Sequence, residues 1–260
     1  QEYKRIFRPK RKHILRYADE SAFRYGVLED VLEKGAKVLD IGSGAGVFVY
    51  VLCRMGFDAC GVEPDRCYAE YSAETLDIAI TNAFFADAKF EAQSLDVVLL
   101  HHVLEHMEDP WEALRKARDI VRQDGFVVVG VPNAEDTRQA PYNRYHKAHL
   151  FTFNPLTLEA MGRKAGLVIH DRIVGPRNGN MVFTFRRQAG AEEHVTELPG
   201  NYERITSILD RFSTPRYFAT SAPYRTLVGK LVGSAGEKLA LRGMGDEKQI
   251  IDSVIQRKIR

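Results

Sequence analysis

The chain has 260 residues, of which 45% are hydrophobic and 28% are charged, and its net charge at pH 7 is +2. This composition suits one globular domain with an appendage, and the near balance of charge excludes a strong overall field for nucleic acid. No apolar run reaches the roughly 18 residues that a membrane-spanning helix needs. The three cysteines (Cys53, Cys60 and Cys67) are too few and wrongly placed for a structural zinc site, and their odd number predicts free thiols in a reducing, cytoplasmic location.

The first segment, from Gln1 to Lys34, is predicted to be helical, because apolar residues recur in it at spacings of three and four. Gly35 ends this helix. We therefore expect residues 1–35 to form a helical cap ahead of the stretch around which the rest of the chain is organised.

That stretch, VLDIGSGAGVFV at residues 38–49, predicts a buried strand, a tight glycine-rich turn and the start of a helix. One glycine permits the turn, one lets a ligand approach the backbone, and one lets the helix pack on the sheet, the three being Gly42, Gly44 and Gly46. The N–H groups at the helix start then face the crevice at the end of the sheet.

A second apolar segment, Ala59 to Val62, ends in an acidic residue, Glu63. In a doubly wound sheet the end of the second strand lies beside the end of the first, and a carboxylate there can accept both hydroxyls of a ribose. Together with the glycine-rich turn, Glu63 predicts an adenosine-type nucleoside bound over these strands, without saying which one.

A later strand, Leu95 to Leu100, is apolar except for Asp96, as expected for a strand buried on both faces. It runs directly into a polar segment that contains His101, His102, Glu105 and His106. Residues just past the carboxyl end of such a strand face the ligand. We therefore expect cofactor and acceptor to meet at this segment.

Four segments, VLDIGSGAG, GVEPD, LDVVLLHHVLEHMEDP and GFVVVGVPN, together resemble the class I S-adenosylmethionine-dependent methyltransferases. The resemblance spans about residues 31–185 and is to the small-molecule subgroup with an L-E-H signature after its fourth strand. It implies a Rossmann-like α/β fold with a seven-stranded, mostly parallel sheet, helices on both faces, and a last strand inserted antiparallel between strands five and six. The methyltransferase domain is then residues 36–188, and residues 189–260 form a helical C-terminal appendage.

The resemblance makes S-adenosylmethionine the expected cofactor and S-adenosylhomocysteine its product. The residues expected to contact it, the last three by resemblance alone, are Asp40, Gly42, Ser43, Gly44, Gly46, Glu63, Pro64, Asp87, Ala88 and His101. Asp40 either organises the methionine ammonium or caps the turn, and Asp87 either binds the adenine amine or caps a helix. No acidic cluster has metal-ligand spacing, so no metal is expected.

The segment from Ala134 to Lys147 is too long for a minimal connection and is rich in polar and aromatic residues. We interpret it as a substrate-facing insertion, with residues Arg138, Tyr142, Asn143, Arg144, Tyr145 and His146. A hydroxyl acceptor must lose its proton, and histidine suits that task near neutral pH. The candidate bases, left open, are His102, His146 and His149, whereas His106 is expected to support its loop.

The favoured function is S-adenosylmethionine-dependent O-methylation of a small molecule, such as a sugar or a quinone-type phenol. One alternative is a non-catalytic protein that binds the cofactor or serves assembly. Another is a nucleic-acid methyltransferase that uses the basic start of the chain, although no convincing nucleic-acid or membrane signal is present. The C-terminal helices are expected to pack on the domain or to form a homodimer.

Overall fold

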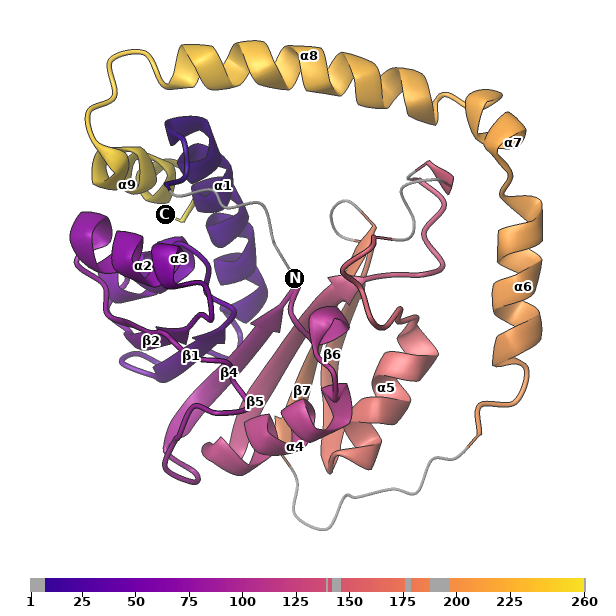
Figure 1. Ribbon diagram of the computed structural model, residues 1–260, viewed down its shortest axis with the longest axis horizontal. Coiled ribbons are helices and arrows are strands. Elements are labelled where there is room, and N and C mark those ends of the chain that lie inside the picture. The colour runs from indigo at the N-terminus through magenta and orange to yellow at the C-terminus, as the bar shows by residue number, and fades with distance from the viewer. Residues whose placement is uncertain (1–7, 139, 142–145, 176–178, 188–196, 260) are drawn as a thin grey trace. The chain divides into compact units, whose positions relative to one another are not determined.

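The computed structural model describes residues 8–138, 140–141, 146–175, 179–187 and 197–259 (Figure 1). Its strands form one seven-stranded sheet in the order β3-β2-β1-β4-β5-β7-β6, which confirms the predicted Rossmann-like α/β fold. The chain divides into two compact units, one of residues 1–99 and 232–260 and one of residues 100–231. Each unit is described by itself below.

The first unit contains the glycine-rich turn between its first strand and helix. Its sheet elements are β1 (Lys37–Ile41), β2 (Asp58–Val62), β3 (Ile80–Thr81) and most of β4 (Leu95–His101), and its helices include α2 (Val47–Arg54), α3 (Arg66–Tyr71) and η1 (Ser72–Leu76). The β1 strand pairs in parallel with β2, and β2 pairs in parallel with β3. Because β1 and α2 consist almost entirely of buried apolar residues, they form the core on which the turn rests.

The third strand of the sheet is short, since β3 has only two residues. Asp77 ends η1 in the left-handed region with φ +57°, which limits the strand at its start. Just after β3, the Asn82 side chain donates to the main-chain oxygens of Glu63 and Pro64. These side-chain bonds take the place of further ladder hydrogen bonds and fix the end of β2.

The first and last helices of the chain pack on each other within the first unit (Figure 1). They are α1 (Arg11–Leu28) and α9 (Glu247–Lys258), and each contributes buried aliphatic side chains, Ile14 and Leu15 from α1 and Ile250 and Ile251 from α9. An ion pair between Lys258 and Asp19 at 2.8 Å joins them at the surface. The end of the chain is therefore part of the unit that carries the glycine-rich turn.

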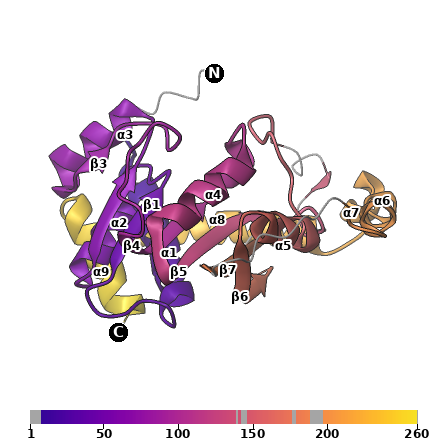
Figure 2. The same cartoon turned by 90° about the horizontal axis from the view of Figure 1, so that it is seen from below.

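The second unit carries the antiparallel part of the sheet (Figure 2). Its elements up to the last strand are η2 (Leu104–His106), α4 (Pro110–Ile120), β5 (Val121–Pro132), α5 (Pro155–Lys164), β6 (Leu167–Val174) and β7 (Asn180–Arg187). The predicted insertion of the last strand is confirmed, because β7 pairs antiparallel with both β5 and β6. Gly162 of α5 makes room for Phe185, since a Cβ there would lie 2.3 Å from the ring.

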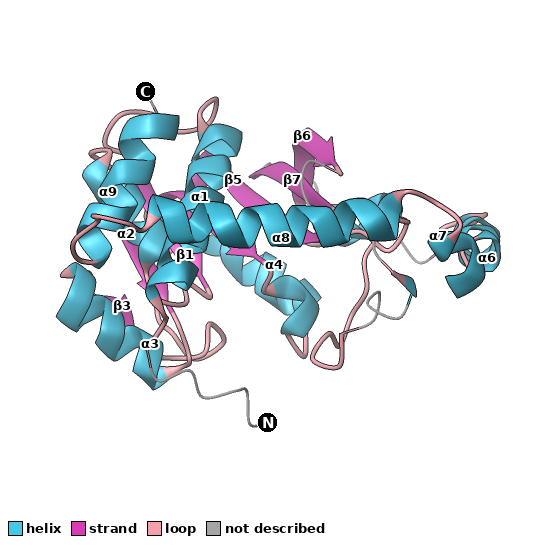
Figure 3. Cartoon of the chain, turned by 90° about the horizontal axis from the view of Figure 1, so that it is seen from above, coloured by secondary structure: helices cyan, strands magenta, loops and turns pink. Residues whose placement is uncertain are grey.

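Beyond the strands lie α6 (Asn201–Arg211), α7 (Thr214–Phe218) and α8 (Ala222–Ala240), which Figure 3 draws in cyan. Helix α6 buries no residue, and Leu227 and Val228 of α8 are exposed. The predicted homodimer through these helices stays a prediction. Within the described residues, no helix combines the length and the apolar character needed to cross a membrane.

Candidate active site

The glycine-rich turn depends on glycine at positions where a side chain would be strained or would collide. Gly42, Gly44 and Gly46 have φ values of +68°, +53° and +73°, in the left-handed region that disfavours other residues. A Cβ at Gly46 would lie 2.9 Å from Cβ of Ser72, so this glycine also allows α2 and η1 to approach each other. A Cβ at Gly44 would meet nothing within 4 Å, which leaves the outer side of the turn open.

Glu63 anchors the turn from the end of β2. The side chain is buried, and its Oε2 accepts the Gly44 N–H at 2.8 Å while its Oε1 accepts the Asp65 N–H at 2.9 Å. Burial raises the pKa of the Glu63 carboxyl, and the two backbone hydrogen bonds oppose that rise. The carboxylate is thus fixed in orientation at the position where a ribose contact is predicted.

Asp40 is a buried carboxyl at the end of β1 with an incomplete set of partners. It is 1% exposed, its Oδ2 lies 3.9 Å from Nη1 of Arg24, and no described group donates a hydrogen bond to that oxygen. Burial raises the pKa of Asp40 to about 6, the Arg24 charge opposes the rise, and the Glu63 charge adds to it. Such an oxygen is suited to a cationic ligand, because a buried polar atom without a partner costs free energy.

A pocket of about 180 Å³ lies over the turn in the first unit. Residues of α1, the turn, the start of α2 and α3 line it, namely Tyr17, Glu20, Ser21, Arg24, Gly42, Ser43, Gly44, Ala45, Val47, Phe48 and Tyr68. The Ser43 hydroxyl and Nε of Arg24 are buried there without a hydrogen-bond partner among the described residues. Asp40 is not a lining residue, but its Oδ2 lies 3.9 Å from Nη1 of Arg24, which is. These three side chains offer one acidic and two donor groups, a set that fits the ammonium and carboxylate of a methionine moiety.

The cap helix α1 therefore contributes four residues to this pocket, Tyr17, Glu20, Ser21 and Arg24. The Arg24 guanidinium stands 5.6 Å from the centre of the Phe48 ring. Two other polar residues of the helix have other partners, since Arg16 pairs with Glu237 and Tyr25 packs against Phe57. Arg24 is distinguished by its approach to Asp40, at 3.9 Å.

Of the predicted cofactor residues only Gly42, Ser43 and Gly44 line this pocket, and Asp40, Gly46, Glu63, Pro64, Asp87 and Ala88 are not among its lining residues. Pro64 and Asp87 are exposed, and Ala88 is buried. The N–H groups of Asp87 and Ala88 both donate to the main-chain oxygen of Phe84, which makes this segment a compact turn. The roles of these three residues toward adenine stay predictions. Asn82, which fixes the end of β2, was missed, because no pattern marks an amide that bonds backbone far along the chain.

His101 is the last residue of β4 and His102 follows it, and both belong to the second unit. The His101 ring lies against Gly130 of β5, where a Cβ would be 2.5 Å from the imidazole, and it meets the His102 ring edge-on at 4.7 Å. The predicted contact of His101 with the cofactor stays a prediction. His102 has φ +57°, a strained value for a residue with a side chain, and strain of this kind concentrates at functional sites.

Two side chains fix the orientation of the His102 ring. Its Nδ1 lies 3.3 Å from Oε1 of Glu105, and its Nε2 lies 2.9 Å from the Asn180 amide nitrogen. The Asn180 amide donates to Nε2, and Nδ1 then carries the proton that the Glu105 carboxylate accepts. Glu105 is 1% exposed, so the imidazole is held by a buried carboxylate, in the manner of a histidine base with an orienting partner.

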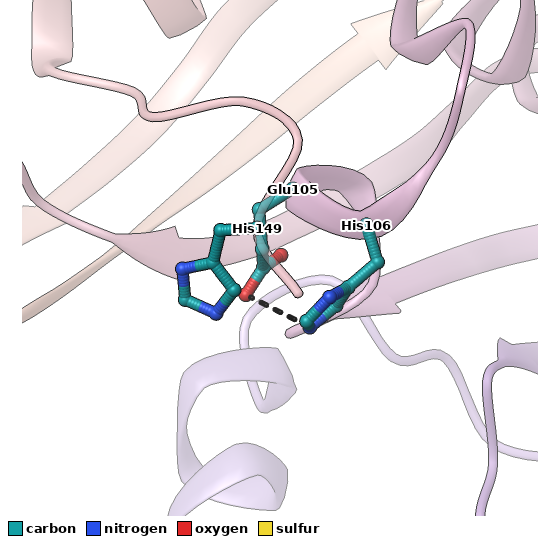
Figure 4. Close-up of side chains that lie close together, drawn as sticks. All are labelled: Glu105, His106 and His149. Carbon is teal, nitrogen blue, oxygen red and sulfur yellow. Dashed lines mark ion pairs between the residues drawn. The ribbon is translucent and has the colours of Figure 1, made fainter. Parts of the chain in front are cut away.

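The L-E-H turn and the segment around His149 form one cluster (Figure 4). The main-chain oxygen of Glu105 accepts N–H bonds from Leu150 and Phe151, and Nδ1 of His106 lies 2.9 Å from the main-chain oxygen of Ala148. As a result the His149 ring lies 4.8 Å from that of His106 and 5.1 Å from that of His146. Burial lowers the pKa of His149, and the Glu105 charge opposes this effect.

The structure thus brings the three candidate bases and the L-E-H turn together within the second unit. Of the predicted substrate-facing insertion, Arg138 pairs with Asp136 and donates to the main-chain oxygen of Gly175. The residues Tyr142, Asn143, Arg144 and Tyr145 lie outside the described residues. The contacts of Glu105 with these histidines were not predicted from the sequence. An acidic residue in the L-E-H segment does not indicate which histidines will lie around it in the folded chain.

The sequence model of a known family, described as a methyltransferase domain, matches residues 10–171, more than half of the chain. The chain belongs to the S-adenosylmethionine-dependent methyltransferases. Ubiquinone biosynthesis O-methyltransferase of Azorhizobium caulinodans is 34% identical to this methyltransferase over 108 residues, which are 38% of this chain and 42% of that protein. The chain thus matches about two fifths of the length of that curated relative.

Solved structures show the same fold. A Thermotoga maritima protein described as a SAM-dependent methyltransferase, possibly a histamine N-methyltransferase, has a TM-score of 0.54 at 18% identity, covering 68% of this chain and 92% of that one. The 1,6-didemethyltoxoflavin-N1-methyltransferase of Burkholderia thailandensis, solved with S-adenosylhomocysteine, has a TM-score of 0.50 at 19% identity, covering 68% and 79%. For this methyltransferase, S-adenosylmethionine is confirmed as the cofactor of the family, whereas the residues that bind it stay predictions.

Proposed function

We propose that this methyltransferase transfers a methyl group from S-adenosylmethionine to an oxygen atom of a small-molecule acceptor. The observation that carries the proposal is a set of buried atoms without a hydrogen-bond partner among the described residues, namely Oγ of Ser43 and Nε of Arg24, which line the pocket, and Oδ2 of Asp40 beside Arg24. Transfer to oxygen is supported by the O-methyltransferase named among the relatives.

In this proposal each group at the pocket has one task. Asp40 accepts from the ammonium of the methionine moiety, and Arg24 and Ser43 donate to its carboxylate. Glu63 accepts from the ribose hydroxyls with the lone pairs that the Gly44 and Asp65 N–H groups leave available. The open outer side of the turn at Gly44 gives the ligand access to the backbone, as a Cβ there would contact nothing within 4 Å.

S-adenosylmethionine supplies a methyl group on a positively charged sulfur, and the chain has to align the acceptor and take its proton. We assign the proton to Nε2 of His102, because Glu105 holds the opposite ring nitrogen. The acceptor hydroxyl displaces the Asn180 amide from Nε2. The O–H bond then breaks toward His102, a C–O bond forms, and the C–S electron pair stays on sulfur in S-adenosylhomocysteine.

Two acceptor classes follow from this chemistry, a quinone-type phenol and a sugar. The name of the A. caulinodans relative favours the phenol, since that protein belongs to ubiquinone biosynthesis. A phenol also loses its proton more readily than a sugar hydroxyl, because its free pKa is about 10, as in tyrosine. The proposal therefore puts the phenol first.

The test is methyl transfer by the full chain to a panel of phenols and sugars, with the methylated product identified by mass spectrometry. We expect a methyl ether from a phenol, and we expect His102→Asn to lower kcat by about 10²- to 10⁴-fold, the usual contribution of a general base. Asparagine is chosen because it tolerates the left-handed backbone of position 102. His170→Asn, on β6, is the matched control and should keep full activity.

The proposal fails if the chain binds no S-adenosylmethionine in a calorimetric titration. If the cofactor binds and His102→Asn keeps the wild-type kcat, the assignment of the base is wrong. In that case His146 and His149 are the bases left to test.

A further inference from the structure

We propose that Glu105, His106 and His149 form a binding site for a divalent transition metal ion such as Zn²⁺. Each residue offers one ligand atom, and these atoms lie within 4.8 Å of one another. Figure 4 shows the Glu105 carboxylate between the two imidazole rings. Two imidazole nitrogens with one carboxylate oxygen form a donor set that Zn²⁺ and neighbouring transition metals prefer.

A second observation comes from the Glu105 carboxylate itself. It is 1% exposed, and its Oε2 accepts no hydrogen bond from the described part of the chain. Its Oε1 lies 3.3 Å from Nδ1 of His102 and 3.9 Å from Nε2 of His106. A buried carboxylate is costly unless it is paired with positive charge or bound to a metal. A divalent cation within this cluster would provide it.

The hydrogen bond of His106 presents the correct nitrogen for coordination. Nδ1 of His106 lies 2.9 Å from the main-chain oxygen of Ala148, so Nδ1 carries the proton and Nε2 carries the lone pair. It is Nε2 that faces Glu105, at 3.9 Å from Oε1. Metal-binding histidines commonly donate their other ring N–H to a main-chain oxygen in this way, which fixes the tautomer and the ring orientation.

The backbone holds the third ligand in place. The Leu150 and Phe151 N–H groups donate to the main-chain oxygen of Glu105 at 2.8 and 3.1 Å, which ties the segment after His149 to the L-E-H turn. Two atoms bound to one ion at about 2.1 Å can be at most about 4.2 Å apart. The ligand atoms now lie up to 4.8 Å apart, so their separation has to shorten when an ion binds. Rotation of the half-buried His149 side chain can shorten it.

This site goes beyond the proposed function, since metal binding does not require methyl transfer. Three protein ligands leave at least one position of a four-coordinate ion for water or another oxygen. One consequence does rest on the proposed function: an acceptor hydroxyl in that position would be more acidic, because the ion stabilises its oxyanion. Its proton would pass to His102, with no change in the oxidation state of the ion.

The test is calorimetric titration of the untagged full chain with Zn²⁺ after treatment with a chelator. We expect about one Zn²⁺ per chain, together with visible absorption bands when Co²⁺ takes the same place. The variants His149→Ala and Glu105→Gln should bind Zn²⁺ at least about tenfold more weakly. His170→Ala, which removes a histidine of the same unit outside the cluster, should bind as the wild type does. Mg²⁺, which prefers oxygen ligands, should bind far more weakly than Zn²⁺.

Absence of Zn²⁺ binding by the folded wild-type chain overturns the metal site, as does equal binding by the wild type and His149→Ala. Circular dichroism shows whether each variant is folded, and the wild-type titration decides the matter even if Glu105→Gln does not fold. Titration of the same samples with S-adenosylmethionine separates the two proposals. Zn²⁺ binding without cofactor binding contradicts only the proposed function, and cofactor binding without Zn²⁺ binding contradicts only the metal site.

Discussion

Oδ2 of Asp40 and Nη1 of Arg24 stand 3.9 Å apart, beyond hydrogen-bond distance, although the Asp40 carboxyl is 1% exposed. The two side chains come from the end of β1 and from α1, so the cap helix supplies the positive charge nearest to the buried acid. A pair this far apart compensates burial only in part, and the pKa of Asp40 accordingly rises to about 6. We expect a cationic ligand to supply the remaining compensation.

Asp40→Asn should weaken S-adenosylmethionine binding by about tenfold or more. The substitution removes the negative charge that faces the ligand ammonium, and a hydrogen bond to a charged group contributes about 1.5–3 kcal/mol. The dissociation constant from calorimetry checks this prediction. Asp58→Asn, at the exposed start of β2, is the control and should leave the constant unchanged. Equal affinity of Asp40→Asn and wild type would show that Asp40 only supports the turn.

Cofactor binding should also depend on pH. A cationic ligand binds the ionised carboxylate, and Asp40 becomes protonated as the pH falls through about 6. The dissociation constant should therefore increase below about pH 6 and stay level above about pH 7. Titrations across this interval should give a flat profile for Asp40→Asn. A wild-type profile as flat as that of the variant contradicts the prediction.

Stability of the ligand-free chain should change in the opposite direction. The pKa of Asp40 is raised from 3.8 to about 6 on folding, so the folded state binds a proton that the unfolded state releases. This contribution is fully present below about pH 4 and is lost as the pH rises through about 6, at a cost on the order of 3 kcal/mol. Urea unfolding should show Asp40→Asn gaining stability relative to wild type between about pH 4 and pH 7. A difference that does not vary with pH would argue against the raised pKa.

Glu63→Gln should affect both the turn and the cofactor. A glutamine amide has one acceptor oxygen, so it can accept only one of the Gly44 and Asp65 N–H groups that Glu63 holds at 2.8 and 2.9 Å. We expect a loss of about 1–3 kcal/mol in the free energy of unfolding, together with weaker cofactor binding. Glu70→Gln, which breaks an exposed ion pair with Arg66 on α3, should change neither quantity. The two readouts are urea unfolding and calorimetry.

The glycine-rich turn and the sheet around it were predictable because their signals are local. Apolar runs end at Asp40 and Val62, and glycine recurs where the backbone must be left-handed, so the chemistry of each position is visible in its neighbours. The antiparallel place of β7 followed from resemblance to the family. These parts of the fold needed no knowledge of distant contacts.

Contacts between distant segments were not visible in the same way. Asn82 shortens β3 by bonding the backbone after β2, and α9 packs on α1 although more than two hundred residues separate them. The cluster of Glu105, His106 and His149 likewise joins two loops whose residues have no metal-ligand spacing in sequence. The backbone bonds between Glu105 and residues 150–151, together with the hydrogen bond of His106 to the main-chain oxygen of Ala148, bring its members together.

The close approach of β5 to the end of β4 gives a prediction about stability. A Cβ at Gly130 would lie 2.5 Å from Cδ2 and 2.9 Å from Nε2 of His101, which is closer than real side chains come. Gly130→Ala should therefore displace the imidazole and lower the free energy of unfolding by about 1–3 kcal/mol. Urea unfolding measures the change.

Gly26→Ala provides the matched comparison. Gly26 lies inside α1, and a Cβ there would meet nothing within 4 Å, so this alanine should raise stability by about 0.5–1 kcal/mol through helix propensity. A glycine-to-alanine substitution is thus expected to lower the free energy of unfolding at position 130 and to raise it at position 26. The reason is that the His101 ring leaves no room for a side chain at Gly130, whereas the space beside Gly26 is open. If Gly130→Ala were as stable as wild type, the His101 ring would have room to move, and its contact with β5 would not define its position.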